Sequence, residues 1–540
     1  MFWADELAAR VDGPQVVNDS KTPSGTIHVG ALRGVVIHDV VLRALRDRGL
    51  EARFVFGIDD LDPMDSATLA TREGVAEYMG RPLADTPAPR GSPHPSWARH
   101  FVATFLDTFG RLGVHPELYW ASEQYRAGVF DDFIRQALDR AADVLRVYRQ
   151  VANVRHPDDW HPVMVICENC GRVGTTYVDD WDGETVHYTC RADLVSWAAG
   201  CGHEGRVSPF GGRTKLPWNL HWVAKWRHFG VTIEGGGKDL STRGGSRDRA
   251  ERLAREVFGF EPPLNIPYEF LTIGGRKMKS SAGTGASAES MAELLPPELV
   301  RFLMLRHRPQ VAVEFDPAGT DAVPRLFDEF DRIAAASAGR EVRGELPPNP
   351  ERIFTFSVVE PDADVRAAGA AYRPPFAHLA LLLQVPGVDV AERVAAEKGA
   401  PLTEAERALL DERLRAARAW LDAYAPERAR LVIHRNRLPS AVAELDPEQR
   451  VTLALLADRL EAIDWSGEAI QAAIFDAARE AGSGAGQAFA ALYRAFLGQP
   501  SGPRAGWLLA SLEREFVRER LREAAGGQVA AASAGPDRGT

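Results

Sequence analysis

The chain contains very little cysteine, only 4 of its 540 residues. So few cysteines cannot form a disulfide scaffold, and we interpret them as reduced thiols or metal ligands. Long apolar runs are missing too, because no stretch of about 18 uninterrupted apolar residues occurs. The N-terminus MFWADELAARVDG carries acids where a signal peptide would be basic. These absences predict a cytoplasmic protein that does not span a membrane.

An overall excess of positive charge is also missing. The 75 acidic residues outnumber the 64 lysines and arginines, giving a net charge of −11, whereas a nucleic-acid binder should carry a basic footprint. Locally the balance reverses: residues 206–255 hold 11 basic and 4 acidic side chains, and residues 411–437 hold 7 and 4. If the protein binds RNA, we expect these two segments to share one face and binding to weaken as salt rises.

With 45% hydrophobic and 26% charged residues, the chain has the composition of a folded protein of about three or four domains. Residues 15–58 have the pattern of a strand, a helix and a second strand, and a second α/β stretch begins near residue 218. The pattern is helical from about residue 296 to 525, and residues 526–540 have the composition of a disordered tail. We expect single helices over 128–148 and 247–258 and a single strand over 265–273.

A glycine-containing turn joins the first predicted strand to the first predicted helix. It has the sequence TPSGTIHVG at residues 22–30, a Gly-x-x-His-x-Gly pattern. Its glycines would let a nucleotide approach bare backbone, while the helix N-terminus and the imidazole of His28 face phosphate oxygens. Taken alone, the element is equally well interpreted as a short turn with an incidental histidine. It is not the G-x-G-x-x-G dinucleotide fingerprint.

A basic, hydroxyl-rich loop follows the last predicted strand of the α/β region. It has the sequence GGRKMKSSAG at residues 274–283. Its lysines could close over a triphosphate and stabilise the charge that develops on departing pyrophosphate. Taken alone, a solvated basic turn is the more common interpretation.

The four cysteines of the chain lie within 35 residues of one another: Cys167, Cys170, Cys190 and Cys201. Tetrahedral coordination of zinc by four thiolates explains this clustering, and such a closed site would be structural because no position stays open for water. His203 could replace either of the two later cysteines. The alternative is a group of reduced thiols without metal.

The turn at 22–30 and the loop at 274–283 together resemble the HIGH and KMSKS signatures of class I aminoacyl-tRNA synthetases. More specifically, the chain resembles the class I lysyl-tRNA synthetases. The resemblance extends over most of residues 20–335, with further blocks in the same order that read GIDDLD, WDGETVHY, HFGVTIEGGGKD and LVRFLMLRHRP.

The resemblance implies an α/β fold: a split Rossmann-like (HUP-type) catalytic domain with an inserted zinc-binding module, followed by an all-α C-terminal anticodon-binding domain. The boundaries that we expect are 1–95 and 216–285 for the two Rossmann halves, 96–215 for the insertion with its zinc module at 160–207, 286–340 for linker helices, 341–525 for the anticodon-binding domain and 526–540 for the tail.

The resemblance also implies catalytic roles for His28, Lys277 and Lys279. It implies ATP contacts from Ser24, Gly25, His28, Gly30, Lys277, Met278, Ser280 and Ser281. The family loop usually reads K-M-S-x-S, whereas this chain has KMKSS, so Lys279 stands where the family has serine.

Recognition of a lysine substrate requires a buried anion for its ammonium group, because an unpaired buried charge is very costly. Asp59, Asp60 and Asp62 follow the second predicted strand and supply candidate carboxylates at the edge where open α/β sheets bind ligands. The resemblance adds Trp218 and Tyr268 as walls of the lysine pocket and Asp239 as a contact to the α-amino group or the ribose.

The implied cofactors are ATP, Mg²⁺ and a structural Zn²⁺, and the implied partners are L-lysine and tRNA(Lys), with the protein acting as a monomer. Three alternatives stay open. The first is a synthetase-like paralogue that serves a carrier other than tRNA, the second is a non-enzymatic zinc-containing RNA-binding protein, and the third is the same chemistry with glutamate.

Overall fold

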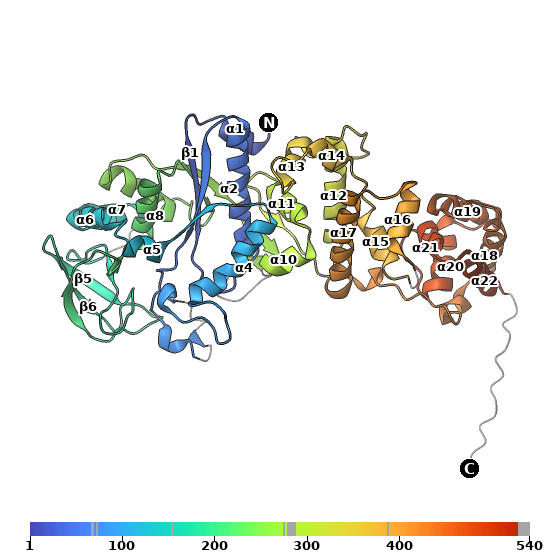
Figure 1. The fold of residues 1–540 in the computed structure, drawn as a ribbon. Helices are drawn as coiled ribbons and strands as arrows, with labels where there is room; N and C mark the ends of the chain where they lie inside the picture. The colour runs from blue at the N-terminus through green and yellow to red at the C-terminus, as the bar shows by residue number, and fades with distance from the viewer. Residues whose placement is uncertain are drawn as a thin grey trace, which may run out of the picture. The chain divides into compact units, whose positions relative to one another are not determined.

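The computed structural model describes residues 1–65, 70–71, 74–152, 156–273, 276–277, 288–385 and 388–526. The chain divides into two compact units (Figure 1). The first consists of residues 1–316 and 332–370, and the second of residues 317–331 and 371–540.

A five-stranded sheet forms the centre of the first unit. Its strand order is β10-β9-β1-β2-β3, and all four pairings are parallel. The strands are β1 (Gln15–Lys21), β2 (Ala52–Ile58), β3 (Glu117–Trp120), β9 (Ile233–Gly237) and β10 (Leu264–Tyr268). Because β1 pairs with β9, two segments far apart in the sequence build one sheet. The expected split Rossmann-like fold is thereby confirmed.

Helix α2 (Gly30–Asp47) lies against β1, β2 and β9. It follows the turn at 22–30 directly and buries apolar residues at helical spacing, among them Leu32, Val36 and Val40. The chain leaves the helix through Gly49, which has a positive φ of 81° that glycine adopts without strain. The helix therefore fixes the turn at the carboxyl end of β1.

The segment between β3 and β9 carries the inserted elements. Its helices are α5 (Ala121–Arg126), α6 (Asp131–Asp139), α7 (Ala141–Ala152) and α8 (Trp218–Phe229), and its strands are β4 (Met164–Val165), β5 (Thr176–Trp181), β6 (Val186–Cys190), β7 (Glu204–Val207) and β8 (Thr214–Lys215). Helix α4 (Trp97–Arg111) and β3 precede them. Strand β3 belongs to the central sheet although it lies inside the range 96–215 that we expected for the insertion.

The single helix expected over 128–148 is wrong, because α6 and α7 are separate helices. The break is at Arg140, which has φ −109° and ψ 26°. Its guanidinium donates to the side chain of Asp143 and to the backbone carbonyl of Glu256. The apolar periodicity continues across the break, so the sequence pattern could not reveal it.

The single strand expected over 265–273 is also wrong. Strand β10 belongs to the central sheet, whereas β11 (Leu271–Ile273) joins a small sheet with β12 (Arg276–Lys277) and β13 (Val313–Glu314). The chain changes partners between them: the carbonyl of Tyr268 accepts from the N–H of Lys238, and the N–H of Glu269 donates to Pro309. The helix expected over 247–258 is α9 (Ser246–Arg252), which continues as a π-helical turn over Leu253–Val257.

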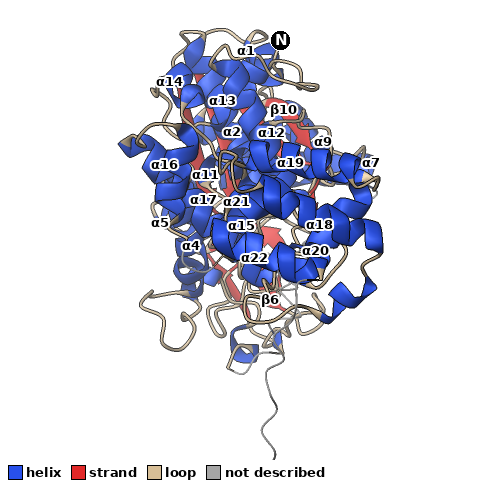
Figure 2. Ribbon diagram, turned by 90° about the vertical axis from the view of Figure 1, so that its right-hand side faces the viewer, coloured by secondary structure: helices blue, strands red, loops and turns tan. Residues whose placement is uncertain are grey.

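The remainder of the chain is helical, as expected. In the first unit it forms α10 (Ala288–Leu294), α11 (Pro297–Leu305), α13 (Pro350–Ser357) and α14 (Val365–Ala370). The first unit also contains the N-terminal helix α1 (Trp3–Ala8). Helix α12 (Ala322–Ser337) runs across the boundary between the units. The helices wholly inside the second unit, among those drawn in blue in Figure 2, are α15 (Phe376–Leu382), α16 (Val390–Lys398), α17 (Glu404–Ala423), α18 (Pro447–Arg459), α19 (Gly467–Glu480), α20 (Ala485–Leu497), α21 (Ala505–Ala510) and α22 (Arg514–Ala525).

Short 3₁₀ turns occupy Ala76–Tyr78, Leu83–Asp85, Glu427–Ala429 and Ser440–Glu444. Within the described parts of the chain, no helix has both the length and the apolar character needed to cross a membrane. Residues 527–540, which make up nearly all of the expected tail, lie outside the described residues.

Candidate active site and metal centre

A cavity of about 280 Å³ opens beside the carboxyl ends of β1, β9 and β10. This is the edge of a parallel sheet where ligands bind in open α/β folds. The first residues of α2 and the N-terminal turn of α8 complete its walls. The cavity therefore joins both halves of the split domain in one site.

Five of the residues that the sequence assigned to a site line this cavity: His28, Gly30, Trp218, Asp239 and Tyr268. Ser24 and Gly25 belong to the same turn but are not among the lining residues. The backbone of Lys277 pairs with Thr272 in the small sheet. Met278, Lys279, Ser280 and Ser281 lie outside the described residues.

Two carboxylates in the cavity were missed by sequence reasoning. Asp19 lies in β1 and Glu234 in β9. Asp19 accepts a hydrogen bond of 2.8 Å from the N–H of Ser20, and Glu234 accepts one from the indole N–H of Trp226. Burial raises the pKa of both carboxyl groups. The available signal was an acidic residue inside each strand, since acidic side chains are rarely buried without a partner or a purpose.

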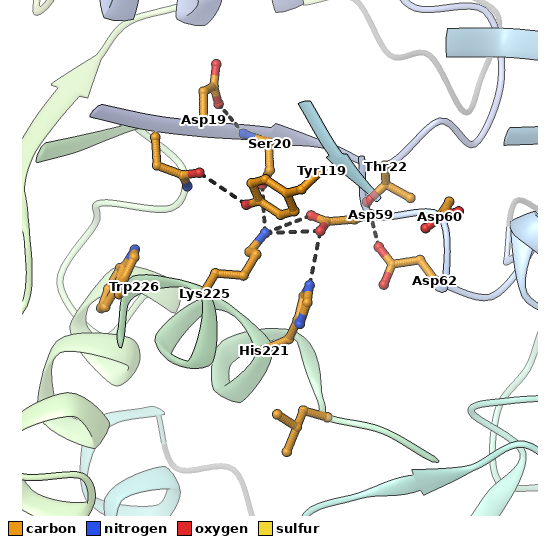
Figure 3. A network of polar contacts seen from close by, with 12 residues as sticks. Asp19, Ser20, Thr22, Asp59, Asp60, Asp62, Tyr119, His221, Lys225 and Trp226 are labelled. Atoms are coloured by element: carbon orange, nitrogen blue, oxygen red, sulfur yellow. Dashed lines mark hydrogen bonds and ion pairs between the residues drawn. The ribbon is translucent and has the colours of Figure 1, made fainter. Parts of the chain in front are cut away.

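Asp59 is engaged inside the protein rather than in the cavity (Figure 3). Both of its oxygens lie 3.1 Å from Nζ of Lys225, and Nε2 of His221 lies 3.1 Å from one of them. Burial acts to raise the pKa of Asp59, but Lys225 and His221 outweigh it and hold that pKa well below its usual range. Asp59 is thus a buried carboxylate that already has its cation.

Asp60 and Asp62 also have internal partners. Asp60 accepts from the N–H and the hydroxyl of Ser122 at 2.8 and 2.5 Å, and burial raises its pKa to about 6. Asp62 lies 2.8 Å from Nζ of Lys215 and accepts from the hydroxyl of Thr22 at 2.6 Å. None of the aspartates 59, 60 and 62 is among the described residues that line the cavity.

The four cysteines converge as the sequence predicts. One ligand atom from each lies within 4.8 Å of the others, and the cluster contains no His203. Sγ of Cys167 is 3.7 Å from that of Cys201, and Sγ of Cys170 is 3.8 Å from that of Cys190. Zinc–sulfur bonds of about 2.3 Å in a tetrahedron place sulfur atoms about 3.8 Å apart, so the donor set and its spacing fit a zinc ion.

The cysteines are presented by turns and strand ends. Cys167 and Cys170 lie in a tight turn in which the N–H of Gly171 donates to the carbonyl of Cys167, and Gly171 has a positive φ of 69°. Cys190 ends β6, and its N–H donates to the carbonyl of His203. His203 therefore supports the cluster through its backbone.

The basic stretch at 411–437 is divided between the interior and the surface. Arg413 is buried against Asp331 and the carbonyl of Pro374, and Trp420 is buried in the helical core. Arg415 and Arg418 are exposed on α17. Some of the residues that looked like an RNA-binding pattern are therefore structural.

Comparison with known proteins gives a family. Residues 1–355 match the family model described as tRNA synthetases class I (K), and residues 435–525 match the one described as anticodon binding domain. The lysine–tRNA ligase of Archaeoglobus fulgidus is 34% identical over 530 residues, which cover 97% of this chain and 100% of that protein. That of Pyrococcus horikoshii is 33% identical over 541 residues, 97% of this chain and 99% of the relative.

Among solved structures, a glutamate-tRNA synthetase from Elizabethkingia anophelis is similar over 95% of this chain, at 13% identity and a TM-score of 0.40. The two family models account for the α/β region with its cysteine insertion and for the end of the helical region. The relatives match along nearly the whole chain. The chain belongs to the class I lysyl-tRNA synthetase family.

Proposed function

We propose that the protein is an ATP-dependent lysine–tRNA ligase. The carboxylate of lysine attacks the α-phosphate of ATP, which yields lysyl-adenylate and pyrophosphate, and the terminal adenosine hydroxyl of tRNA(Lys) then takes the lysyl group. No protein nucleophile is needed, because positioning and charge stabilisation supply the catalysis. We expect this reaction in the cytoplasm and from a monomer.

The observation that carries this proposal is the charge of the cavity. Asp19, Glu234 and Asp239 line it, whereas its described lining includes one lysine and no arginine. A cationic substrate fits such a site, and the glutamate alternative would need an arginine-rich pocket. We assign the ε-ammonium of lysine to Asp19 or Glu234, which replace the aspartates 59, 60 and 62 of the sequence interpretation.

Aromatic side chains would hold the methylenes of the substrate. Trp218 and Tyr268 line the cavity as the resemblance implies, and Trp222 lies beside Trp218 with a ring-centroid distance of 4.6 Å. Apolar walls around the stem with carboxylates at its end match the amphipathic shape of a lysine side chain. Asp239 is left for the α-amino group or the ribose.

The nucleotide would lie along the turn at 22–30. His28 and Gly30 line the cavity at the start of α2, where the backbone N–H groups and the helix dipole favour phosphate. Ser24 and Gly25 precede them in the same turn. For Lys277, Met278, Lys279, Ser280 and Ser281 we keep the role in ATP binding that the sequence suggests, with Mg²⁺ neutralising the triphosphate.

The four cysteines would hold a structural zinc ion, and the helical second unit would bind the anticodon of tRNA. The match of residues 435–525 to an anticodon-binding model supports tRNA as the acceptor over another carrier. The charged cavity speaks against a purely RNA-binding protein, which would have no use for it.

Charging assays test the proposal. The full-length protein is incubated with total tRNA, ATP, Mg²⁺ and either labelled lysine or labelled glutamate. We expect lysyl-tRNA and no glutamyl-tRNA. Formation of glutamyl-tRNA, or no charged product where a known lysyl-tRNA synthetase is active, would refute it. Aminoacyl-adenylate released without transfer to tRNA would favour the paralogue that serves another carrier.

A further inference from the structure

Asp62 connects the turn at 22–30 to the strand pair beneath the cysteine cluster. One of its oxygens accepts from the hydroxyl of Thr22 at 2.6 Å, as Figure 3 shows, and the other lies 2.8 Å from Nζ of Lys215. Lys215 is in β8, where it pairs with Met164 of β4. Three residues after Met164 the chain reaches Cys167, the first cysteine of the cluster.

The loop that follows Asp62 is held by the cysteine turn itself. The carbonyl of Asp62 accepts a hydrogen bond from the N–H of Leu83. Met79 and Gly80, which lie shortly before Leu83, contact the segment that follows Cys170. The N–H of Val173 donates to the carbonyl of Gly80 at 2.7 Å, and Nε of Arg172 donates to Met79 at 2.8 Å. Asp62 is therefore tied to the cysteine module from two directions.

The link is sensitive to charge and geometry because it is buried. The side chain of Lys215 is 1% exposed and that of Asp62 is 14% exposed. Loss of one partner of a buried ion pair leaves an uncompensated charge, so the pair resists separation. A displacement of β8 is consequently transmitted to Asp62 and through it to Thr22.

We infer that Asp62 is a positioning residue that couples metal binding at the four cysteines to nucleotide binding at the turn that begins at Thr22. This inference rests on the proposed ATP and zinc sites. A metal ion that orders β4 and β8 fixes Lys215 and Asp62, and Asp62 holds the turn in the conformation that accepts phosphate. Coupling between binding sites is reciprocal, so bound ATP must in turn raise the affinity of the four cysteines for metal.

The test measures the zinc affinity of the full-length protein by equilibrium competition with an absorbing chelator, with Mg²⁺ and either ATP or CTP. Both triphosphates bind free zinc alike, so the difference between the two zinc affinities reports the effect of the nucleotide site. We expect ATP to raise the zinc affinity of the wild type about 5-fold or more relative to CTP. In Thr22→Val, which removes the hydroxyl but keeps the Asp62–Lys215 pair, we expect the two zinc affinities to be equal.

A matched control has a threonine–aspartate hydrogen bond that is not part of the link through Asp62. The hydroxyl of Thr185 donates to Asp182 at 2.6 Å at the surface of the cysteine module. Thr185→Val should keep the full ATP effect, and Thr22→Ser, which retains the hydroxyl, should keep it too. An ATP effect as large in Thr22→Val as in the wild type would overturn the inference, as would loss of the effect in Thr185→Val.

A second measurement needs no variant. Calorimetric titration with ATP of the zinc-loaded and the metal-free wild type should give weaker binding, by about 5-fold or more, for the metal-free protein. Equal affinities would contradict the coupling while leaving the proposed function intact. Absence of ATP binding to the zinc-loaded wild type would instead refute the proposed function itself.

Discussion

At the scale of single residues, the partner of a carboxylate decides what that carboxylate can bind. Asp59 faces Lys225 and Asp62 faces Lys215, so the protein itself neutralises both. Asp19 and Glu234 accept hydrogen bonds from neutral groups, a backbone N–H and an indole. His38 lies 3.5 Å from Asp19, but among the described residues neither carboxylate forms an ion pair with a lysine or an arginine. A cation supplied by the substrate is the natural complement of the second pair.

Replacement of the cavity carboxylate that pairs with the ammonium should impair lysine binding. In Asp19→Asn or Glu234→Gln the ε-ammonium loses a charge-assisted hydrogen bond, worth about 1.5 to 3 kcal/mol. We expect the KM for lysine in tRNA charging to rise roughly 10- to 100-fold, while the KM for ATP changes little.

Glu117→Gln is the control for these variants, since Glu117 lies in the same sheet but at its exposed edge, paired with Arg53. It should leave the KM for lysine unchanged. An unaltered KM for lysine in both cavity variants would show that the ammonium binds elsewhere.

Asp60 predicts a pH dependence of stability. Its pKa is about 6 in the folded protein because of burial, above the value of about 4 in an unfolded chain. The folded state therefore takes up this proton first, so the contribution of Asp60 to the free energy of unfolding increases as pH falls through 6. Relative to Asp60→Asn, the wild type should gain about 1 kcal/mol between about pH 7 and about pH 5.

Urea unfolding of the two proteins at both pH values measures this difference. All other titrating groups are the same in the wild type and in Asp60→Asn, so their contributions cancel in the difference between the two proteins. A constant difference, or one that shrinks at the lower pH, would contradict the raised pKa of Asp60.

The sequence located the edge of the sheet where ligands should bind, but not which carboxylates face the cavity. The sequence interpretation assigned Asp59 and Asp62 to the lysine substrate because it could not foresee their internal cations, Lys225 and Lys215, which are more than 150 positions away in the chain. His28 and Tyr268 could be assigned because each belongs to a recognisable block. Asp19 belongs to none of the quoted blocks, and the block HFGVTIEGGGKD does not by itself mark its Glu234 as a ligand. Both carboxylates become visible only once β1 and β9 pair.

Among helices and strands, local sequence patterns predicted which elements exist and of which type, but they did not predict how strands pair with one another. The strand, helix and second strand predicted within residues 15–58 are β1, α2 and β2, because their periods are clear and Gly49 marks the end of the helix. The division of 265–273 into β10 and β11 could not be predicted, because the partners of each half lie in distant parts of the chain.

Removal of the metal should loosen the cysteine module without unfolding the sheet. The module has short strands and few means of holding Cys167 near Cys201 without an ion, whereas β1 and β2 pair along seven residues. After chelation we expect new protease cleavage within 160–207 and faster amide exchange there. The β1–β2 region should keep its protection.

Incubation with chelator that has been saturated with zinc serves as the control. Cleavage spread evenly over the chain after chelation would mean that the metal stabilises the whole first unit. An unchanged cleavage pattern would mean that the four thiols hold no structural metal.

At the scale of the whole molecule, the net charge of −11 contrasts with basic segments at 206–255 and 411–437. Basic side chains that contact phosphates release counterions, so the affinity for tRNA should fall steeply with salt. We expect at least about a 10-fold loss between about 50 and 200 mM KCl, measured by filter binding.

The KM for lysine provides the comparison, because the carboxylates Asp19 and Glu234 are largely buried and are screened less by salt than surface charges. It should change far less than tRNA affinity over the same range of salt. Equal sensitivity of both, or salt-independent tRNA binding, would argue against an electrostatic RNA interface.

The most direct measurement is a crystal structure of the protein with a non-hydrolysable lysyl-adenylate analogue. We expect the ε-ammonium to lie within hydrogen-bond distance of Asp19 or Glu234, with the phosphate-like group beside His28 at the start of α2. An analogue bound outside this cavity, or an ammonium group paired with Asp59 or Asp62 in place of Lys225 or Lys215, would contradict this expectation.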